Sequence, residues 1–125
     1  MNILATGADG CIEVSGIKIS TSKMTVDNER YSIYEDQTND LVNSITVLKP
    51  KQSTRGHTHK HWESYRFDKT GGTLYLNGLG MDITADQKIE IPPNTHHRVI
   101  NDSNEAISFL CQWFASEVVK NKVSM

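Results

Sequence analysis

The five histidines of this chain lie in two short groups between residues 57 and 97. His57, His59 and His61 form the first group, and Glu63 follows it closely. Two adjacent histidines, at positions 96 and 97, form the second group directly after a Pro-Pro-Asn-Thr segment. Imidazole nitrogens and carboxylate oxygens are ligands that divalent transition metals take in proteins. This clustering therefore predicts a metal site.

The spacing within each group indicates which side chains can share one ion. On an extended backbone, residues two apart face the same side at about 6.5–7 Å, so His57 and His59 should project together. Glu63 follows after a short connection and can return an oxygen ligand to the same point. Because His96 and His97 are neighbours, they face opposite ways, and only one of them can belong to the site.

The elements that position these residues are expected to be short strands. Alternating and β-branched residues dominate the chain, and no window of helical length has a convincing apolar stripe. We expect strands over residues 12–20, 30–34, 42–48, 64–67, 73–76, 79–83, 88–91, 98–101 and 106–114. Residues 116–122 are expected to form either a helical turn or a frayed tail. Such short strands favour an antiparallel sandwich or small barrel.

Turn residues add detail to this pattern. Gly16 falls where the alternation changes phase, and we expect a bulge there. Residues 68–72 are expected to close a hairpin between the strands at 64–67 and 73–76. The Asn77-Gly78 pair is a strong signal for a two-residue hairpin turn. The whole chain of 125 residues is expected to fold as one domain.

The two histidine groups, taken in order, resemble the two sequence motifs of the cupin superfamily. The first cupin motif is His-x-His, three or four residues and then Glu, which His57, His59 and Glu63 match. The second is Pro-x-Gly-x-x-His-x-x-x-Asn, which residues 92–101 match with Asn in place of the glycine. The resemblance implies metal ligands His57, His59, Glu63 and His97, and it leaves His96 outside the site.

The same resemblance implies an all-β fold, an antiparallel double-stranded β-helix or jelly-roll barrel with extra N-terminal strands. We expect the barrel over residues 45–114, the additional strands within 1–44 and a C-terminal tail at 115–125. Extra strands leave open sheet edges, which favour association, so residues 1–44 are expected at an edge or in a dimer interface. The expected oligomer is a homodimer.

Some positions depart from the family pattern in the loops. Lys51, Asp86 and Asn94 stand where turn glycines are usual. Asp and Asn tolerate positive φ better than other residues with a side chain, so those two turns should survive, whereas Lys51 should mark a different turn. Seven residues separate Glu63 from Gly71, which implies a longer or bulged hairpin.

Composition excludes several classes of protein. A formal net charge of -2 with scattered Lys and Arg argues against nucleic-acid binding. No apolar run is long enough to cross a membrane, and no export signal is recognisable. Cys11 and Cys111 are far apart in sequence and are expected to be reduced, with Cys111 as a small buried hydrophobe. We therefore expect a cytoplasmic protein.

The cofactor expected is one divalent transition metal, and Mn, Fe, Zn, Ni and Co all suit three imidazoles and a carboxylate. Tyr65 is in phase with Glu63 and is expected inside the barrel, as a catalytic acid, a substrate anchor or a packing residue. His61 is either a proton-transfer group or an exposed loop histidine. The periodicity leaves open whether Gln112 or its neighbours Cys111 and Trp113 face the cavity.

Three functions follow from this site. The first is a metal-dependent isomerase, epimerase or lyase acting on a sugar, sugar phosphate or polyhydroxy acid, with Tyr65 and His61 as candidate catalytic residues. The second is an Fe(II)-dependent dioxygenase of a small molecule. The third is a sensor or binding barrel without catalysis. The ligand set is the same in all three, so the sequence leaves the choice open.

Overall fold

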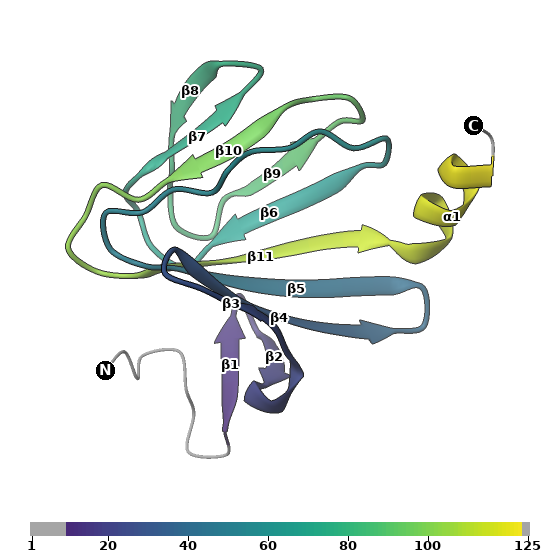
Figure 1. The fold of residues 1–125 in the computed structure, drawn as a ribbon, viewed down its shortest axis with the longest axis horizontal. Helices are drawn as coiled ribbons and strands as arrows, with labels where there is room; N and C mark the ends of the chain where they lie inside the picture. Colours follow the sequence, from purple (N-terminus) through teal and green to yellow (C-terminus); the bar gives the residue numbers. More distant parts are fainter. Residues whose placement is uncertain (1–9, 124–125) are drawn as a thin grey trace.

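The computed structural model describes the backbone of residues 10–123 and the side chains of residues 10–119 (Figure 1). Its elements are β1 (Cys11–Val14), β2 (Ile17–Ser20), the 3-10 helix η1 (Thr21–Lys23), β3 (Met24–Asp27), β4 (Tyr31–Thr38), β5 (Leu41–Leu48), β6 (Glu63–Phe67), β7 (Thr73–Leu76), β8 (Leu79–Asp82), β9 (Lys88–Ile91), β10 (His97–Ile100), β11 (Ile107–Phe114) and α1 (Ala115–Val123). Within these residues no helix is long and apolar enough to cross a membrane.

The strands form antiparallel sheets, as the sequence predicted. The larger sheet has the order β3-β4-β5-β11-β6-β9, and the smaller sheet has the order β10-β7-β8. A separate hairpin, β1-β2, lies against the larger sheet (Figure 1). β3, β4 and β5 follow one another in the larger sheet as they do in sequence, whereas β11 lies between β5 and β6 and so brings distant parts of the chain together. This arrangement is the double-stranded β-helix expected from the sequence.

Aromatic side chains fill the space between the two main sheets. Along β6 the burial alternates, and Glu63, Tyr65 and Phe67 all point inward. Phe67 and Phe109 are almost completely buried, with ring centroids 5.0 Å apart. Burying side chains of this size is a main favourable contribution to folding. The alternation that builds this core also aims Glu63 and Tyr65 at the interior.

The outer face of the larger sheet is covered at one end by the β1-β2 hairpin. Ile12, Val14 and Ile19 are buried on the inner side of the hairpin. They form a second apolar cluster with Ile45 of β5 and Leu110 of β11. Two hydrophobic clusters therefore lie on opposite faces of the same sheet.

The bulge expected at Gly16 is wrong, because residues 12–20 form two strands rather than one. Ser15 and Gly16 both have positive φ, at 51° and 82°, as a two-residue turn of type I′ requires. The hairpin register pairs Ile12 with Ile19. The change of phase at Gly16 is thus a reversal of the chain, after which the apolar residues return to the same face.

The hairpin expected around residues 68–72 is also wrong. β6 and β7 do not pair, since they belong to different sheets. Asp68 instead joins its chain segment to β11 by exchanging hydrogen bonds of 2.9 Å with the backbone of Ser108. Gly72 then passes so close to β10 that an added Cβ would lie 2.7 Å from the Ile100 carbonyl oxygen. The connection is a crossover from one sheet to the other, and its polar residues resemble those of a turn.

Three turns adopt the left-handed backbone despite lacking glycine. Asp86 and Asn94 have φ of 64°, as expected for these residues. Lys51 has φ of 62°, so the expectation of a different turn there is wrong. Its ammonium group donates to the Asp102 carbonyl oxygen at 2.7 Å, and its backbone N–H donates to Ser103. These bonds offset the backbone cost of about 1–2 kcal/mol for a side chain in this region.

Other expectations have mixed outcomes. The Asn77-Gly78 turn is confirmed, since it joins β7 to β8 with positive φ at both residues. Strand β3 had no clear sequence signal and was missed. The C-terminal segment forms helix α1. The division into residues 1–44, 45–114 and 115–125 stays a prediction, and its first boundary lies inside β5.

Candidate metal centre

Four side chains from three parts of the chain meet between the two sheets. Glu63 begins β6 in the larger sheet, and His97 begins β10 in the smaller sheet. His57 and His59 lie in the connection that leads to β6 rather than in a regular strand. His57 is held in place because its backbone exchanges hydrogen bonds of 3.2 and 3.1 Å with His97.

The potential ligand atoms of these residues all lie within 4.8 Å of one another. His59 Nε2 is 2.7 Å from Glu63 Oε1, and His97 Nε2 is 3.5 Å from the same oxygen. His57 Nε2 lies 3.2 Å from His97 Nε2. Since metal–ligand bonds are about 2.0–2.2 Å long, ligand atoms on one ion lie within roughly 4.4 Å of each other. A small adjustment of these side chains would bring all four atoms onto one ion.

The backbone fixes which nitrogen two of these histidines present to the centre. His59 Nδ1 is 3.0 Å from the His61 carbonyl oxygen, and His97 Nδ1 is 2.9 Å from the Thr95 carbonyl oxygen. A carbonyl oxygen can only accept, so each Nδ1 carries a proton, and when the ring is neutral its Nε2 is a bare nitrogen that faces the cluster. His59 Nε2 can also take up a second proton and donate it in a hydrogen bond to the ionised Glu63. Metal-bound histidines are oriented in this way by a second hydrogen bond. The donor set therefore fits a divalent transition metal.

The electrostatics of the cluster keep its carboxylate in the form that binds a metal. Burial alone would raise the pKa of Glu63, but hydrogen bonds and charge from His59 and His97 lower it to about 2. Burial lowers the pKa of His59, and the hydrogen bond and charge of Glu63 outweigh that effect, so the net shift is upward. Burial and the neighbouring His97 lower the pKa of His57. The site thus holds an ionised carboxylate among imidazoles that must lose their protons to bind an ion.

His96 lies outside this cluster, as the cupin register implied. It is exposed, and its backbone N–H donates to the side chain of Asn77 at 2.9 Å. Its ring packs over Gly56, where an added Cβ would lie 2.8 Å from His96 Cε1. Gly56 is therefore needed next to His57 both for its positive φ of 84° and for this close contact.

A small cavity of about 120 Å³ opens beside the cluster. Its lining includes His57, Tyr65, Phe109 and the hydroxyl-bearing residues Tyr31, Thr46 and Thr54, together with Arg55. The sequence predicted Tyr65 inside the barrel and did not single out Arg55 as a site residue. One signal was available, because Arg55 lies two residues before His57 in an extended segment and can face the same side.

Tyr65 packs directly against the candidate ligands. Its ring meets His97 edge-on at a centroid distance of 5.7 Å and stacks on Phe109 at 5.3 Å. Burial raises the pKa of Tyr65 well above its ordinary value, and Cys111 and Glu63 add to the rise. The phenol therefore stays protonated at neutral pH and can donate a hydrogen bond into the cavity.

His61 lies behind the cluster and is not among the residues lining the cavity. Its ring stacks on His59 at 4.0 Å with an interplanar angle of 9°. Burial and the nearby His59 lower the pKa of His61, which favours the neutral ring. In this position it supports His59 instead of meeting a ligand in the cavity.

The facing of β11 is settled by the structure. Cys111 is buried on the inner side and pairs directly with Tyr65 across the strands. Gln112 faces the opposite way and donates to Asn43 Oδ1 at 2.7 Å. The cavity is therefore lined by the alternate residues of β11 that include Phe109, and Gln112 belongs to the outer face.

Comparisons with known proteins support the fold. No protein-family model matches the chain, and no curated protein matches it in sequence. A Cupin 2 conserved barrel domain protein from Salinispora arenicola is 18% identical, with a TM-score of 0.65, covering 91% of this chain and 98% of that one. An RmlC-like cupin from Shewanella frigidimarina is 11% identical, with a TM-score of 0.63, covering 74% and 82%.

A third similar structure, a predicted oxalate decarboxylase from Thermotoga maritima, is 18% identical with a TM-score of 0.65 and covers 78% of this chain and 98% of that one. Identities this low establish the fold alone. The chain has the cupin fold, as its two histidine motifs predicted, and its His57, His59, Glu63 and His97 form a cluster that could hold a metal.

The two adjacent histidines provide a matched test of the cluster. Replacing His97 by Ala should reduce metal content severely, because it removes a buried ligand atom facing Glu63. Replacing His96 by Ala should leave the metal content unchanged, since His96 lies outside the cluster. Metal analysis of both variants after purification without chelator checks this. The opposite result would show that the register assumed for the second motif, with His97 as the ligand, is wrong.

Metal affinity should fall as the pH is lowered. The raised pKa of His59 means that protons compete with the ion already near neutral pH, whereas Glu63, with a pKa of about 2, stays ionised. We expect a loss of about tenfold in affinity per pH unit for each proton displaced. Chelator competition between pH 5 and 8 measures this. An affinity that does not change over that interval would contradict the expected cluster chemistry.

Proposed function

We propose that this protein is a metal-dependent enzyme that acts on a small, oxygen-rich molecule by proton transfer, as an isomerase, epimerase or lyase. The observation that carries the proposal is the cavity beside the four-residue cluster. Its lining brings together His57, several hydroxyl-bearing residues and Arg55. At about 120 Å³ it suits a substrate well below the size of a drug molecule.

The lining favours a polyhydroxy acid within this substrate class. Arg55 can bind a carboxylate through two parallel hydrogen bonds, and Thr46 and Thr54 can bind substrate hydroxyl groups. One structural neighbour is described as a predicted oxalate decarboxylase, which agrees with a small carboxylate in such a cavity. A divalent ion held by the cluster would polarise a substrate carbonyl and make the adjacent C–H bond more acidic.

Two residues have distinct roles in this proposal. Tyr65 donates its hydroxyl proton, or a hydrogen bond, to a substrate oxygen that becomes more basic during the reaction. Its raised pKa suits a donor rather than a base. His61 acts through His59, because its carbonyl oxygen and its stacked ring hold the orientation of that imidazole. It is therefore a positioning residue.

The test is a substrate screen on the protein loaded separately with Mn, Fe, Co, Ni and Zn. Polyhydroxy acids, neutral sugars and sugar phosphates are compared, and oxygen consumption is followed in parallel. Turnover of an acid without oxygen uptake supports the proposal. Arg55→Leu should then raise KM by roughly 10–100-fold, the effect of losing a hydrogen bond to a charged group.

Two other outcomes would replace this proposal. Oxygen consumption that depends on Fe(II) and a small molecule would identify a dioxygenase. Tight binding of an organic molecule that is recovered unchanged, with no turnover under any metal, would identify a binding or sensor barrel. Both alternatives use the same ligand cluster, so the metal content alone does not separate them.

Replacing Tyr65 by Phe should slow the reaction and leave the metal bound. The phenyl ring of the variant keeps the packing on Phe109, so only the hydroxyl is lost. General acid help is typically about 10²–10⁴-fold in rate, which sets the expected decrease in kcat. Tyr75→Phe on β7 is the matched control, since Tyr75 lies outside the cavity lining. Equal activity of the two variants would show that the Tyr65 hydroxyl takes no part in the reaction.

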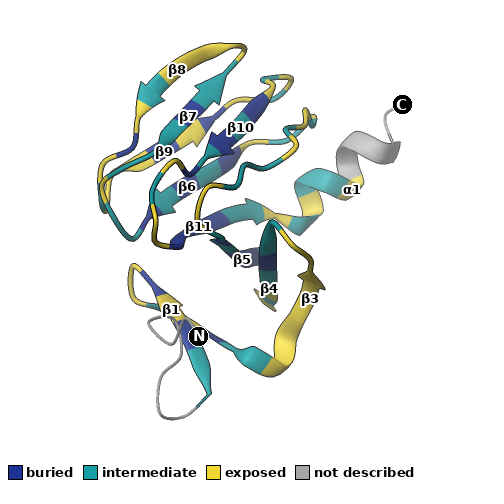
Figure 2. Cartoon of the chain, turned by 60° about the vertical axis from the view of Figure 1, so that its left-hand side comes forward, coloured by how far each residue is buried: buried dark blue, intermediate teal, exposed yellow. Residues whose placement is uncertain are grey.

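We further propose that the protein is a homodimer paired through its N-terminal strands. β3 is an edge of the larger sheet, and every residue in it is exposed (Figure 2). Met24 and Val26 present apolar side chains along this edge. An open edge of this kind is prone to pair with another strand. Light scattering should give the mass of two chains, and V26K should shift it towards one chain.

A further inference from the structure

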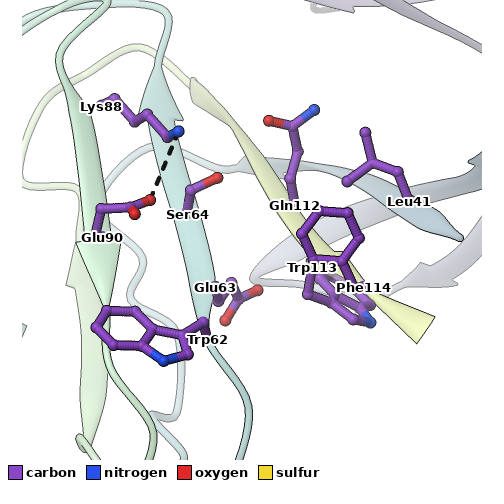
Figure 3. Close-up of a pocket in the computed structure, with 9 residues that line it drawn as sticks. All are labelled: Leu41, Trp62, Glu63, Ser64, Lys88, Glu90, Gln112, Trp113 and Phe114. Atoms are coloured by element: carbon purple, nitrogen blue, oxygen red, sulfur yellow. Dashed lines mark ion pairs between the residues drawn. The ribbon is translucent and has the colours of Figure 1, made fainter. Parts of the chain in front are cut away.

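A second hollow lies at the outer face of the larger sheet, and it reaches the metal cluster at Glu63, which is one of its lining residues. It has a volume of about 260 Å³ and lies where β9, β6 and β11 run side by side (Figure 3). We call it the outer groove, and its lining shares no residue with the cavity that contains Arg55 and Tyr65. Its volume is below the usual range of about 300–1,000 Å³ for drug-sized ligands, so it suits a smaller molecule.

One part of the outer groove is a row of polar side chains across neighbouring strands. The strand register places Ser64 directly between Glu90 and Gln112. Lys88 lies beside Glu90, with 3.7 Å between Nζ and Oε1. The donation from Gln112 Nε2 to Asn43 leaves the carbonyl oxygen of Gln112 to accept other bonds. The row offers both donors and acceptors, and its two charges cancel.

The other part of the outer groove is aromatic. Trp62 and Phe114 are 50% and 52% exposed, which is unusual for such large apolar rings, and Trp113 lies beside them. The backbone N–H of Trp62 donates to Glu117 Oε1 at 3.1 Å, so helix α1 holds this loop in place. Figure 3 shows Trp62 on one side of Glu63 and the rings of Trp113 and Phe114 on the other.

We infer that the outer groove binds a neutral carbohydrate through one of its pyranose rings. A sugar ring has an apolar C–H surface that packs on exposed aromatic rings such as Trp62. Its hydroxyl groups both donate and accept, which matches Ser64 and Gln112. The balance between Lys88 and Glu90 favours an uncharged ligand over an ion. A purely apolar partner would leave the whole polar row unpaired, at a cost in affinity.

This inference does not rest on the proposed enzymatic function. The enzyme cavity carries the cation Arg55 and suits an acid. In the outer groove Lys88 is paired with Glu90, and the charge of Glu63 is compensated by His59 and His97, so the groove suits a neutral ligand.

Tyr65 points inward and Ser64 outward, and the groove meets the metal cluster at Glu63. Trp62 and Gln112 belong to neither the cavity lining nor the cluster, so variants at these residues test the groove without removing the proposed enzyme site.

The experiment is a titration of the full chain with cellotriose, maltotriose and chitotriose, followed by tryptophan fluorescence and by calorimetry. We expect at least one of them to bind at millimolar concentration or below. Trp62→Ala and Gln112→Leu should each weaken that binding by about tenfold or more, as truncation of a central contact residue does. Leu79→Ala is the control, since Leu79 is exposed on β8 in the other sheet and should leave binding unchanged.

Three results would overturn the inference. The first is no binding of any of the three saccharides at millimolar concentration. The second is binding that survives both groove variants but is lost in Arg55→Leu, which would place the sugar in the inner cavity. The third is a dimer that Trp62→Ala dissociates, which would show that a second copy covers the groove. Trp62 is half exposed, so its variant should fold, and thermal unfolding of each variant verifies this.

Discussion

The buried carboxylate of Glu63 is the group on which the arrangement of this molecule depends. Only 7% of its side chain is exposed, and an isolated buried carboxylate costs several kcal/mol in lost hydration. His59 and His97 compensate for that cost, and they come from a connection and from the opposite sheet. The charge of one residue therefore requires both sheets and the segment before β6 to meet at one point.

Most of the site could be predicted because it depends on local spacing. His57, His59 and Glu63 are close in sequence, and the second motif places His97 by its distance from Pro92 and Asn101. What spacing could not give is the way in which the two motifs meet. That contact is a backbone bridge between His57 and His97, 40 residues apart in the chain, and it is formed by long-range strand pairing.

The errors of sequence reasoning share a physical cause. Turns and crossover connections are built from the same polar and glycine residue types. The segment 68–72 was therefore expected to be a hairpin turn, although it connects two different sheets. Gly16 and Lys51 show the same ambiguity for single residues. The backbone at Ser15 and Gly16 reverses the chain, and Lys51 tolerates positive φ because two distant carbonyl oxygens accept hydrogen bonds from its ammonium group and its backbone N–H. Such compensation comes from tertiary contacts and leaves no local signal.

The alternation along β6 explains how one strand can support two separate binding surfaces. Glu63 and Tyr65 face the interior. Hydrogen bonds and charge from His59 and His97 keep Glu63 ionised despite its burial, whereas burial keeps Tyr65 protonated. Ser64, between them, faces outward into a polar row completed by β9 and β11. Because neighbouring residues of a strand face opposite sides, the outer surface can change its chemistry with little effect on the metal cluster. A single sheet of the barrel can therefore acquire a ligand site on its outer face while the chemistry of its inner face stays the same.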